Sequence, residues 1–220
     1  ALFGTPDEPR VPPEINLDVA KLKLAAGPVR SDIVGRKNGL YREHCAHCHG
    51  VTGDGMGPTA AFLNPYPRDY RPGVFKFKST ERADKPTHPD LVMVLRNGLA
   101  GSSMPSFALL SDAKIDALAE YVKYLSIRGE VELSLMRAYF ELDDEDEGVL
   151  PQSREFLFEE IIDPVTEMWA AADDAIIDVP DMPADLDMVA SIAKGKELFY
   201  GNKANCVKCH GVSGLGDGQA

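Results

Sequence analysis

Residues 45–49 read Cys-Ala-His-Cys-His, and residues 206–210 repeat the pattern as Cys-Val-Lys-Cys-His. The two stretches contain all 4 cysteines of the chain. On a helix, positions i, i+3 and i+4 lie on one face, so Cys45, Cys48 and His49 are predicted to point the same way. The sequence thus brings two thiols and an imidazole together twice.

The spacing Cys-x-x-Cys-His is typical of covalent attachment of c-type haem, in which the thiols add to the vinyl groups and the imidazole binds iron. We therefore predict two covalently bound haem c groups. The predicted thioether cysteines and iron-binding histidines are Cys45, Cys48 and His49 for the first haem, and Cys206, Cys209 and His210 for the second. Because haem c is attached outside the cytoplasm, the sequence predicts a periplasmic or otherwise exported protein.

Two other uses of paired cysteines fit the spacing less well. A structural zinc site has its two Cys-x-x-Cys pairs about 15–20 residues apart, whereas 157 residues lie between Cys48 and Cys206. A thioredoxin-like redox pair needs a βαβ context, which the hydrophobic pattern does not indicate.

The two motifs belong to an internal repeat. An offset of 161 also superimposes Gly50 on Gly211, Val51 on Val212 and Gly53 on Gly214. Such self-similarity is typical of two copies of one module. The first copy continues for about eighty residues after His49, whereas only ten residues follow His210. We therefore interpret the chain as a shortened or processed two-module protein, or as one whose second haem is completed by another group.

Composition excludes several classes of protein. The net charge of -12 argues against general nucleic-acid binding, and no apolar run approaches the ~20 residues of a membrane span. The 44% of apolar residues is ordinary for a chain with a packed core. Charge is concentrated in residues 129–190, which hold 2 basic and 19 acidic side chains, a net charge of −17. This segment reads as a helical connector with a solvated acidic face, or as a surface that steers a basic redox partner; calcium binding by residues 143–147 lacks the usual ligand pattern.

Helical patterns cover most of the chain. They are predicted over 33–43, from His88-Pro89-Asp90 to Gly98, and from Ser111 to Gly129, with further helices over 130–142, 152–173 and 186–200. Between them, residues 50–75 form a loop without regular period. The helix after Ser111 carries an apolar stripe at helical spacing, formed by Ile115, Leu118, Ala119, Val122 and Leu125.

Residues 31–128 resemble a class I cytochrome c domain of the small bacterial type. The resemblance is carried by Cys45–His49, by Gly-Asp-Gly-Met-Gly-Pro at 53–58 and by Gly-Ser-Ser-Met-Pro at 101–105. It implies that Met104 is the second axial ligand of the first iron and that the carbonyl of Pro58 accepts a hydrogen bond from His49. Met93 is then a core methionine, and Met56 lies too close to His49 in sequence to reach the opposite haem face. Three side chains are candidates for the surroundings of the haem, where an Arg fork matches a propionate: Tyr66, Arg68 and Tyr70.

We therefore expect an all-α fold: a cytochrome c-like helical module with long loops, an acidic helical connector, and the start of a second such module. The expected segments are an N-terminal extension over 1–30, module 1 over 31–128, the connector over 129–185 and the incomplete module 2 over 186–220.

The expected function is transfer of single electrons between protein redox partners by a dihaem cytochrome c in a respiratory-type chain, without bond-breaking catalysis. Two alternatives stay open. One is a dihaem peroxidase-like enzyme with an open site at the second haem. The other is a cytochrome subunit of a larger membrane electron-transfer complex.

Overall fold

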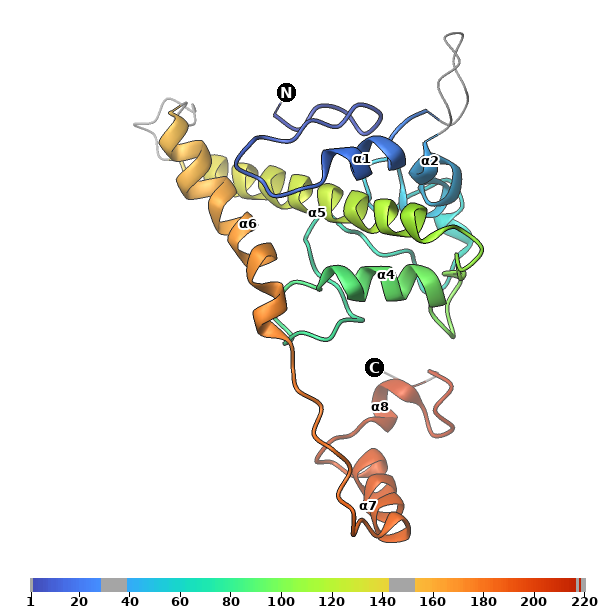
Figure 1. The fold of residues 1–220 in the computed structure, drawn as a ribbon. Coiled ribbons are helices and arrows are strands. Elements are labelled where there is room, and N and C mark those ends of the chain that lie inside the picture. The colour runs from blue at the N-terminus through green and yellow to red at the C-terminus, as the bar shows by residue number, and fades with distance from the viewer. Residues whose placement is uncertain (1, 29–38, 143–152, 217, 219–220) are drawn as a thin grey trace. The chain divides into compact units, whose positions relative to one another are not determined.

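The structure is a computed structural model that describes residues 2–28, 39–142, 153–216 and 218. It divides into two compact units, Ala1–Ile177 and Asp178–Ala220, shown in Figure 1. The described part is helical, and its only β pairings are the isolated bridges Gly4↔Pro9 and Thr80↔Ile176. The predicted all-α class is confirmed.

Helix α5, Asp112–Phe140, is the central element of the first unit. It begins after Ser111, as predicted, although the Ser111 side chain makes no capping hydrogen bond. The predicted apolar stripe is confirmed, since each of its members is buried: Ile115, Leu118, Ala119, Val122 and Leu125. These side chains lie on one face of α5, and the other elements of the unit pack against that face.

The prediction that Gly129 ends this helix is wrong, because α5 continues for another eleven residues to Phe140. A buried Val131 extends the apolar face beyond the glycine. Gly129 instead marks a close crossing: a Cβ atom added there would lie 2.5 Å from Cα of Arg71. A glycine inside a helix often permits such an approach of another backbone. The predicted module boundary at residue 128 therefore falls inside one continuous helix.

This crossing makes Gly129→Ala a destabilising substitution. At an exposed position inside a helix, replacing glycine with alanine raises the free energy of unfolding by about 1 kcal/mol. Here the added methyl meets the backbone of Arg71, and overpacking of this kind costs about 1–3 kcal/mol. We expect a lower free energy of unfolding in chemical denaturation. A stabilised Gly129→Ala protein would contradict the crossing.

The N-terminal segment is tied to α5 over a long sequence separation. Helix α1, Val19–Ala25, is capped by Asp18, whose Oδ1 accepts from the backbone N–H of Ala20 at 2.9 Å and of Lys21 at 3.1 Å. Before it, residues 2–17 form a strap beside α5 (Figure 1). The hydroxyl of Tyr124 donates to the carbonyl of Phe3 at 2.6 Å, and Tyr121 donates to the carbonyl of Pro6. These bonds make the strap part of the first unit.

Short helices and a long loop complete the part of the first unit that carries the first motif. They are α2 (Leu40–His44), α3 (Ala46–His49), the 3-10 turn η1 (Ala60–Phe62) and α4 (His88–Asn97). At the start of α4, Thr87 and Asp90 cap each other's backbone N–H groups, which satisfies donors that a helix start leaves free. Gly98 follows the last residue of α4, as predicted. Of the helix predicted over 33–43, residues 33–38 lie outside the described part.

The acidic segment folds back as helix and packs on α5. It comprises η3 (Phe156–Ile162), α6 (Asp163–Ala170) and η4 (Ala171–Ala175), which confirms the helical prediction over 152–173 for the described residues. Its inward side chains recur at helical spacing and are buried: Ile161, Val165, Trp169 and Ala172. Residues 143–147, considered above for calcium, lie outside the described part of the chain.

The second unit contains α7, Met188–Tyr200, and α8, Val207–His210. Asp187 caps α7 by accepting from the N–H groups of Val189 and Ala190 at 3.0 Å. The helix predicted over 186–200 is thus confirmed, and it buries none of its residues. Throughout the described residues, no helix combines the length and the apolar character needed to span a bilayer.

Candidate functional site

The first Cys-x-x-Cys-His stretch is a single tight turn of helix. Cys45 precedes α3, and its carbonyl accepts from the N–H of Cys48 at 3.1 Å and of His49 at 2.9 Å. The chain then reverses at Gly50, whose φ of 76° suits a residue without a side chain. Tyr41 of α2 fixes this reversal, because its hydroxyl donates to the carbonyl of Gly50 at 2.8 Å.

The imidazole of His49 is buried, and one of its two nitrogens makes a hydrogen bond to the backbone. Its Nδ1 donates to the backbone carbonyl of Arg68 at 3.0 Å. The ring stacks on Tyr70, with centroids 4.6 Å apart and planes inclined by 22°. Burial lowers the pKa of His49, which favours the uncharged form that binds metals. A proton fixed on Nδ1 leaves the lone pair of Nε2 for an iron ion.

The prediction that the carbonyl of Pro58 accepts from His49 is wrong; the acceptor is Arg68. The loop explains the difference. The segment after Pro58 turns back toward α3, with the N–H of Thr59 donating to the carbonyl of His47 at 2.9 Å. Residues 67–70 instead lie across the glycine turn, where the N–H of Tyr70 donates to the carbonyl of Gly53 at 2.7 Å. That contact brings the Arg68 carbonyl to the imidazole.

The four cysteines are free thiols, the groups that would form thioether bonds to a haem. All four are free of disulfides. Burial raises the pKa of Cys45 to about 12, which disfavours the thiolate that zinc binding or disulfide exchange requires. Cys48 is partly exposed, and its Sγ lies 3.2 Å from the hydroxyl oxygen of Thr59. Among the described residues, no group of three or more His, Cys, Asp or Glu side chains could hold a metal ion.

The three methionines of the first module differ in their surroundings. Met104 is partly buried against the hydrophobic core. Its loop is tightly built, since the N–H of Leu99 donates to the carbonyl of Met104 at 3.1 Å and the hydroxyl of Ser102 accepts from its N–H at 3.2 Å. Met56 is 80% exposed. Met93 is 49% exposed, so the prediction that it is a core methionine is wrong. Of the three, Met104 is the thioether that the fold orders best.

The side chains of the three residues predicted for the haem surroundings differ in exposure. Tyr66 is 73% exposed and the Arg68 side chain is also exposed. Tyr70 is buried against His49, where it orients the imidazole. Sequence reasoning missed the backbone role of Arg68, because a carbonyl contact leaves no signal in residue type.

The second motif repeats the backbone of the first. In both, the histidine N–H donates to the first cysteine's carbonyl at 2.9 Å. The N–H of Gly55 donates to the carbonyl of His49 at 2.9 Å, and that of Gly216 to His210 at 2.9 Å. The three reversing glycines after each histidine have φ between 74° and 79°: Gly50, Gly53 and Gly55, and Gly211, Gly214 and Gly216.

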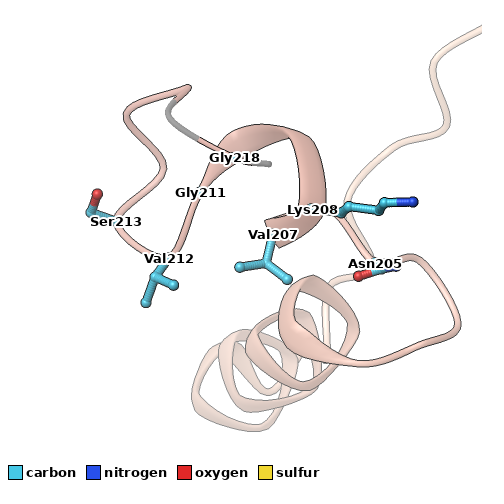
Figure 2. Close-up of a pocket in the computed structure, with 7 residues that line it drawn as sticks. All are labelled: Asn205, Val207, Lys208, Gly211, Val212, Ser213 and Gly218. Atoms are coloured by element: carbon cyan, nitrogen blue, oxygen red, sulfur yellow. The ribbon is translucent and has the colours of Figure 1, made fainter. Parts of the chain in front are cut away.

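The side chains around the second motif are more open. His210 and Cys209 are exposed, and Tyr200 of α7 donates to the carbonyl of Val212 at 2.7 Å. A pocket of about 530 Å³ lies on this loop itself. Figure 2 shows its lining, in which the Lys208 side chain points away from those of Val207 and Val212. The second unit thus presents a loop with the backbone form of the first motif and with apolar side chains beside it.

Comparisons with known proteins agree with this site. Residues 35–122 match the family described as cytochrome C oxidase, cbb3-type, subunit III. A chain of the reducing HAO-like protein complex of Kuenenia stuttgartiensis is similar in structure, with a TM-score of 0.52 and 25% identity over 82% of this chain. The match spans 63% of that chain's length. A search of curated proteins found no match.

The residues of the first site fit a haem c group, because two free thiols and a neutral imidazole with an open Nε2 adjoin one another in sequence and on one tight turn. The turn supplies three donors, fewer than the four ligands of a structural zinc site, and no further donor joins them among the described residues. The match over residues 35–122 supports a cytochrome c domain with covalently bound haem c and a role in carrying electrons.

Proposed function

We propose that this chain is a dihaem cytochrome c that carries single electrons between protein redox partners in a respiratory-type chain. Cys45, Cys48 and His49 hold the first haem in this proposal. Met104 would supply the thioether ligand of the same iron, as in a His/Met cytochrome of class I. The second haem is held by Cys206, Cys209 and His210.

One observation supports the count of two: the backbone hydrogen bonds of the second motif, from Cys209 to Gly216, repeat those from Cys48 to Gly55 in the first. The correspondence extends to Gly57 and Gly218. A Cβ atom on Gly57 would lie 2.4 Å from the carbonyl oxygen of His47, and one on Gly218 would lie 2.2 Å from that of Lys208. His47 and Lys208 are equivalent under the offset of 161. Both loops therefore require glycine at this position, which supports a shared function for the two motifs.

When bound, haem c supplies reversible one-electron chemistry at its iron. The protein's own residues anchor and tune it. The Arg68 carbonyl holds the proton on Nδ1 of His49, which fixes the orientation of the ring and raises its basicity as a ligand. Tyr70 covers one face of that ring and keeps water from it.

Partners and location follow from the same proposal. The exposed acidic side chains of η3 and α6, among them Glu159, Glu160 and Glu167, suit a redox partner with a basic surface, whose association would weaken with salt. The similar chain from Kuenenia stuttgartiensis is part of a protein complex, which supports work within an assembly. Because haem c is attached outside the cytoplasm, we propose a periplasmic or otherwise exported protein.

Intact mass tests the proposal directly. The natural protein is expected to carry the mass of two haems. The paired substitutions Cys45→Ser/Cys48→Ser and Cys206→Ser/Cys209→Ser should each remove one. If the second pair changes nothing beyond the serine substitutions and the natural protein holds one haem, the dihaem proposal is wrong.

A second candidate function is a dihaem peroxidase-like enzyme, favoured by the exposure of His210. Peroxide turnover by the haem-loaded protein distinguishes the two. Turnover by the natural protein that disappears in Cys206→Ser/Cys209→Ser, in which the first haem remains, would establish the enzyme.

A further inference from the structure

A row of aromatic rings leads from His49 to the acidic helix α6. His49 stacks on Tyr70 at 4.6 Å, and Tyr70 stacks on Phe75 with centroids 6.0 Å apart and planes inclined by 12°. Phe75 meets Trp169 of α6 edge-on, with centroids 6.1 Å apart. Both geometries are among those that aromatic pairs prefer. The rings form a continuous contact from the proposed iron ligand to an element ninety-nine residues beyond Tyr70 in sequence.

The far end of this row is fixed in place. Trp169 is 4% exposed, and its Nε1 donates to Oε1 of Glu130 at 2.8 Å. Lys85 pairs with the same carboxylate, and its Nζ lies 5.7 Å from the Trp169 ring centroid. If the indole turned away from Phe75, it would lose its hydrogen bond to the buried carboxylate of Glu130.

We propose that Tyr70, Phe75 and Trp169 form the route by which an electron passes between the His49 site and the α6 surface. This inference rests on the proposed function, in which His49 binds the iron of the first haem. Electronic coupling falls off faster across a gap than through contacting π systems, and the covalent path between Trp169 and Tyr70 is far too long to compete. One electron moves from a one-electron donor protein at α6 to the oxidised site; no bond is made or broken, and no ring is itself oxidised.

Phe75 is the residue on which the route depends and the best one to change. It is partly exposed, so substitution there disturbs the core less than at Tyr70 or Trp169. Phe75→Leu removes the ring and keeps an apolar side chain. Phe75→Tyr keeps the ring and is the matched control. Both are made in full-length Cys206→Ser/Cys209→Ser protein, so that only the first haem reports.

The experiment measures photo-triggered electron transfer from a ruthenium sensitiser attached at Met168→Cys, an exposed position on α6 next to Trp169. A second protein carries the sensitiser at Phe62→Cys on η1, an element in contact with α3. Phe75→Leu is expected to slow transfer from the α6 label several-fold and to leave transfer from the η1 label unchanged. Phe75→Tyr should match the parent from both labels. The reduction potential, measured by spectroelectrochemistry, should be the same in all of them, so that driving force is not the cause.

Each other outcome overturns the route. Equal α6-label rates in parent and Phe75→Leu show that the rings do not carry the coupling. Equal slowing from both labels shows a general disturbance of the haem site. A parent protein without covalent haem fails the proposed function itself, and the intact mass identifies that case separately.

Discussion

Replacing Lys85 with methionine is expected to lower the free energy of unfolding by about 3–5 kcal/mol, because it leaves the carboxylate of Glu130 buried without its cation. Lys85 and Glu130 are 6% and 7% exposed and pair directly. The Trp169 indole bonds the same carboxylate, so loop, α5 and α6 share this one contact. Denaturant unfolding followed by circular dichroism measures the loss. Lys23→Met, at an exposed lysine of α1, is the control, with an expected change within about 0.5 kcal/mol.

The loss in Lys85→Met should shrink in acid. Burial raises the pKa of Glu130, while hydrogen bonds from Lys85 and Trp169 act to lower it. Removing Lys85 therefore raises the pKa further. A carboxyl whose pKa is raised in the folded state favours folding when protonated, and that contribution is lost as pH rises through the folded value. The difference in free energy of unfolding between the natural protein and the variant should be largest near neutral pH. It should decrease as the pH falls toward the ordinary pKa range of a carboxyl group. A gap that widens in acid would contradict a buried charge at Glu130.

Met104→Ala is expected to lower the reduction potential of the first haem by a sizeable part of the roughly 0.8 V range that axial ligands control. A thioether opposite histidine raises the potential of haem iron, and Met104 is the methionine that the loop 98–107 orders against the core. Spectroelectrochemical titration gives the potential, and the optical spectrum of the oxidised protein reports loss of the iron–sulfur bond.

Two matched substitutions complete this test. Met93→Ala and Met56→Ala remove the same side chain from positions that are 49% and 80% exposed. Neither should move the potential or the spectrum. If Met93→Ala abolishes the spectral signature of the iron–sulfur bond and Met104→Ala does not, the thioether ligand is Met93 of α4 and not Met104.

Local signals predicted much of the helical structure. The His88-Pro89-Asp90 start of α4 and the apolar stripe of α5 are short-range features, and both are confirmed. The end of α5 was predicted wrongly because glycine has two uses. It commonly ends helices, but Gly129 is needed where Arg71 crosses the helix. Nothing within the helix sequence distinguishes a terminator from a crossing.

The sequence alone indicates the candidate ligands of the site, whereas the residues that support them appear only in the structure. The two Cys-x-x-Cys-His stretches contain their own geometry in five residues. The acceptor for His49 depends on how residues 53–70 fold, and a backbone carbonyl looks the same at Pro58 and at Arg68. The Lys85–Glu130–Trp169 contact joins three segments far apart in sequence, so it could be found only from the structure.

The tyrosine hydroxyls that hold the strap have a consequence for the order of assembly. Phe3 and Pro6 leave the ribosome more than a hundred residues before Tyr121 and Tyr124, their hydrogen-bond donors on α5. Contacts between residues so far apart in sequence form slowly, because the chain loses the entropy of closing the loop before the contact stabilises the fold. This N-terminal segment, although it is made before α5, should therefore be among the last parts of the unit to dock. Hydrogen exchange during refolding should protect the amides of α5 before that of Asp18, which donates to Glu120 of α5.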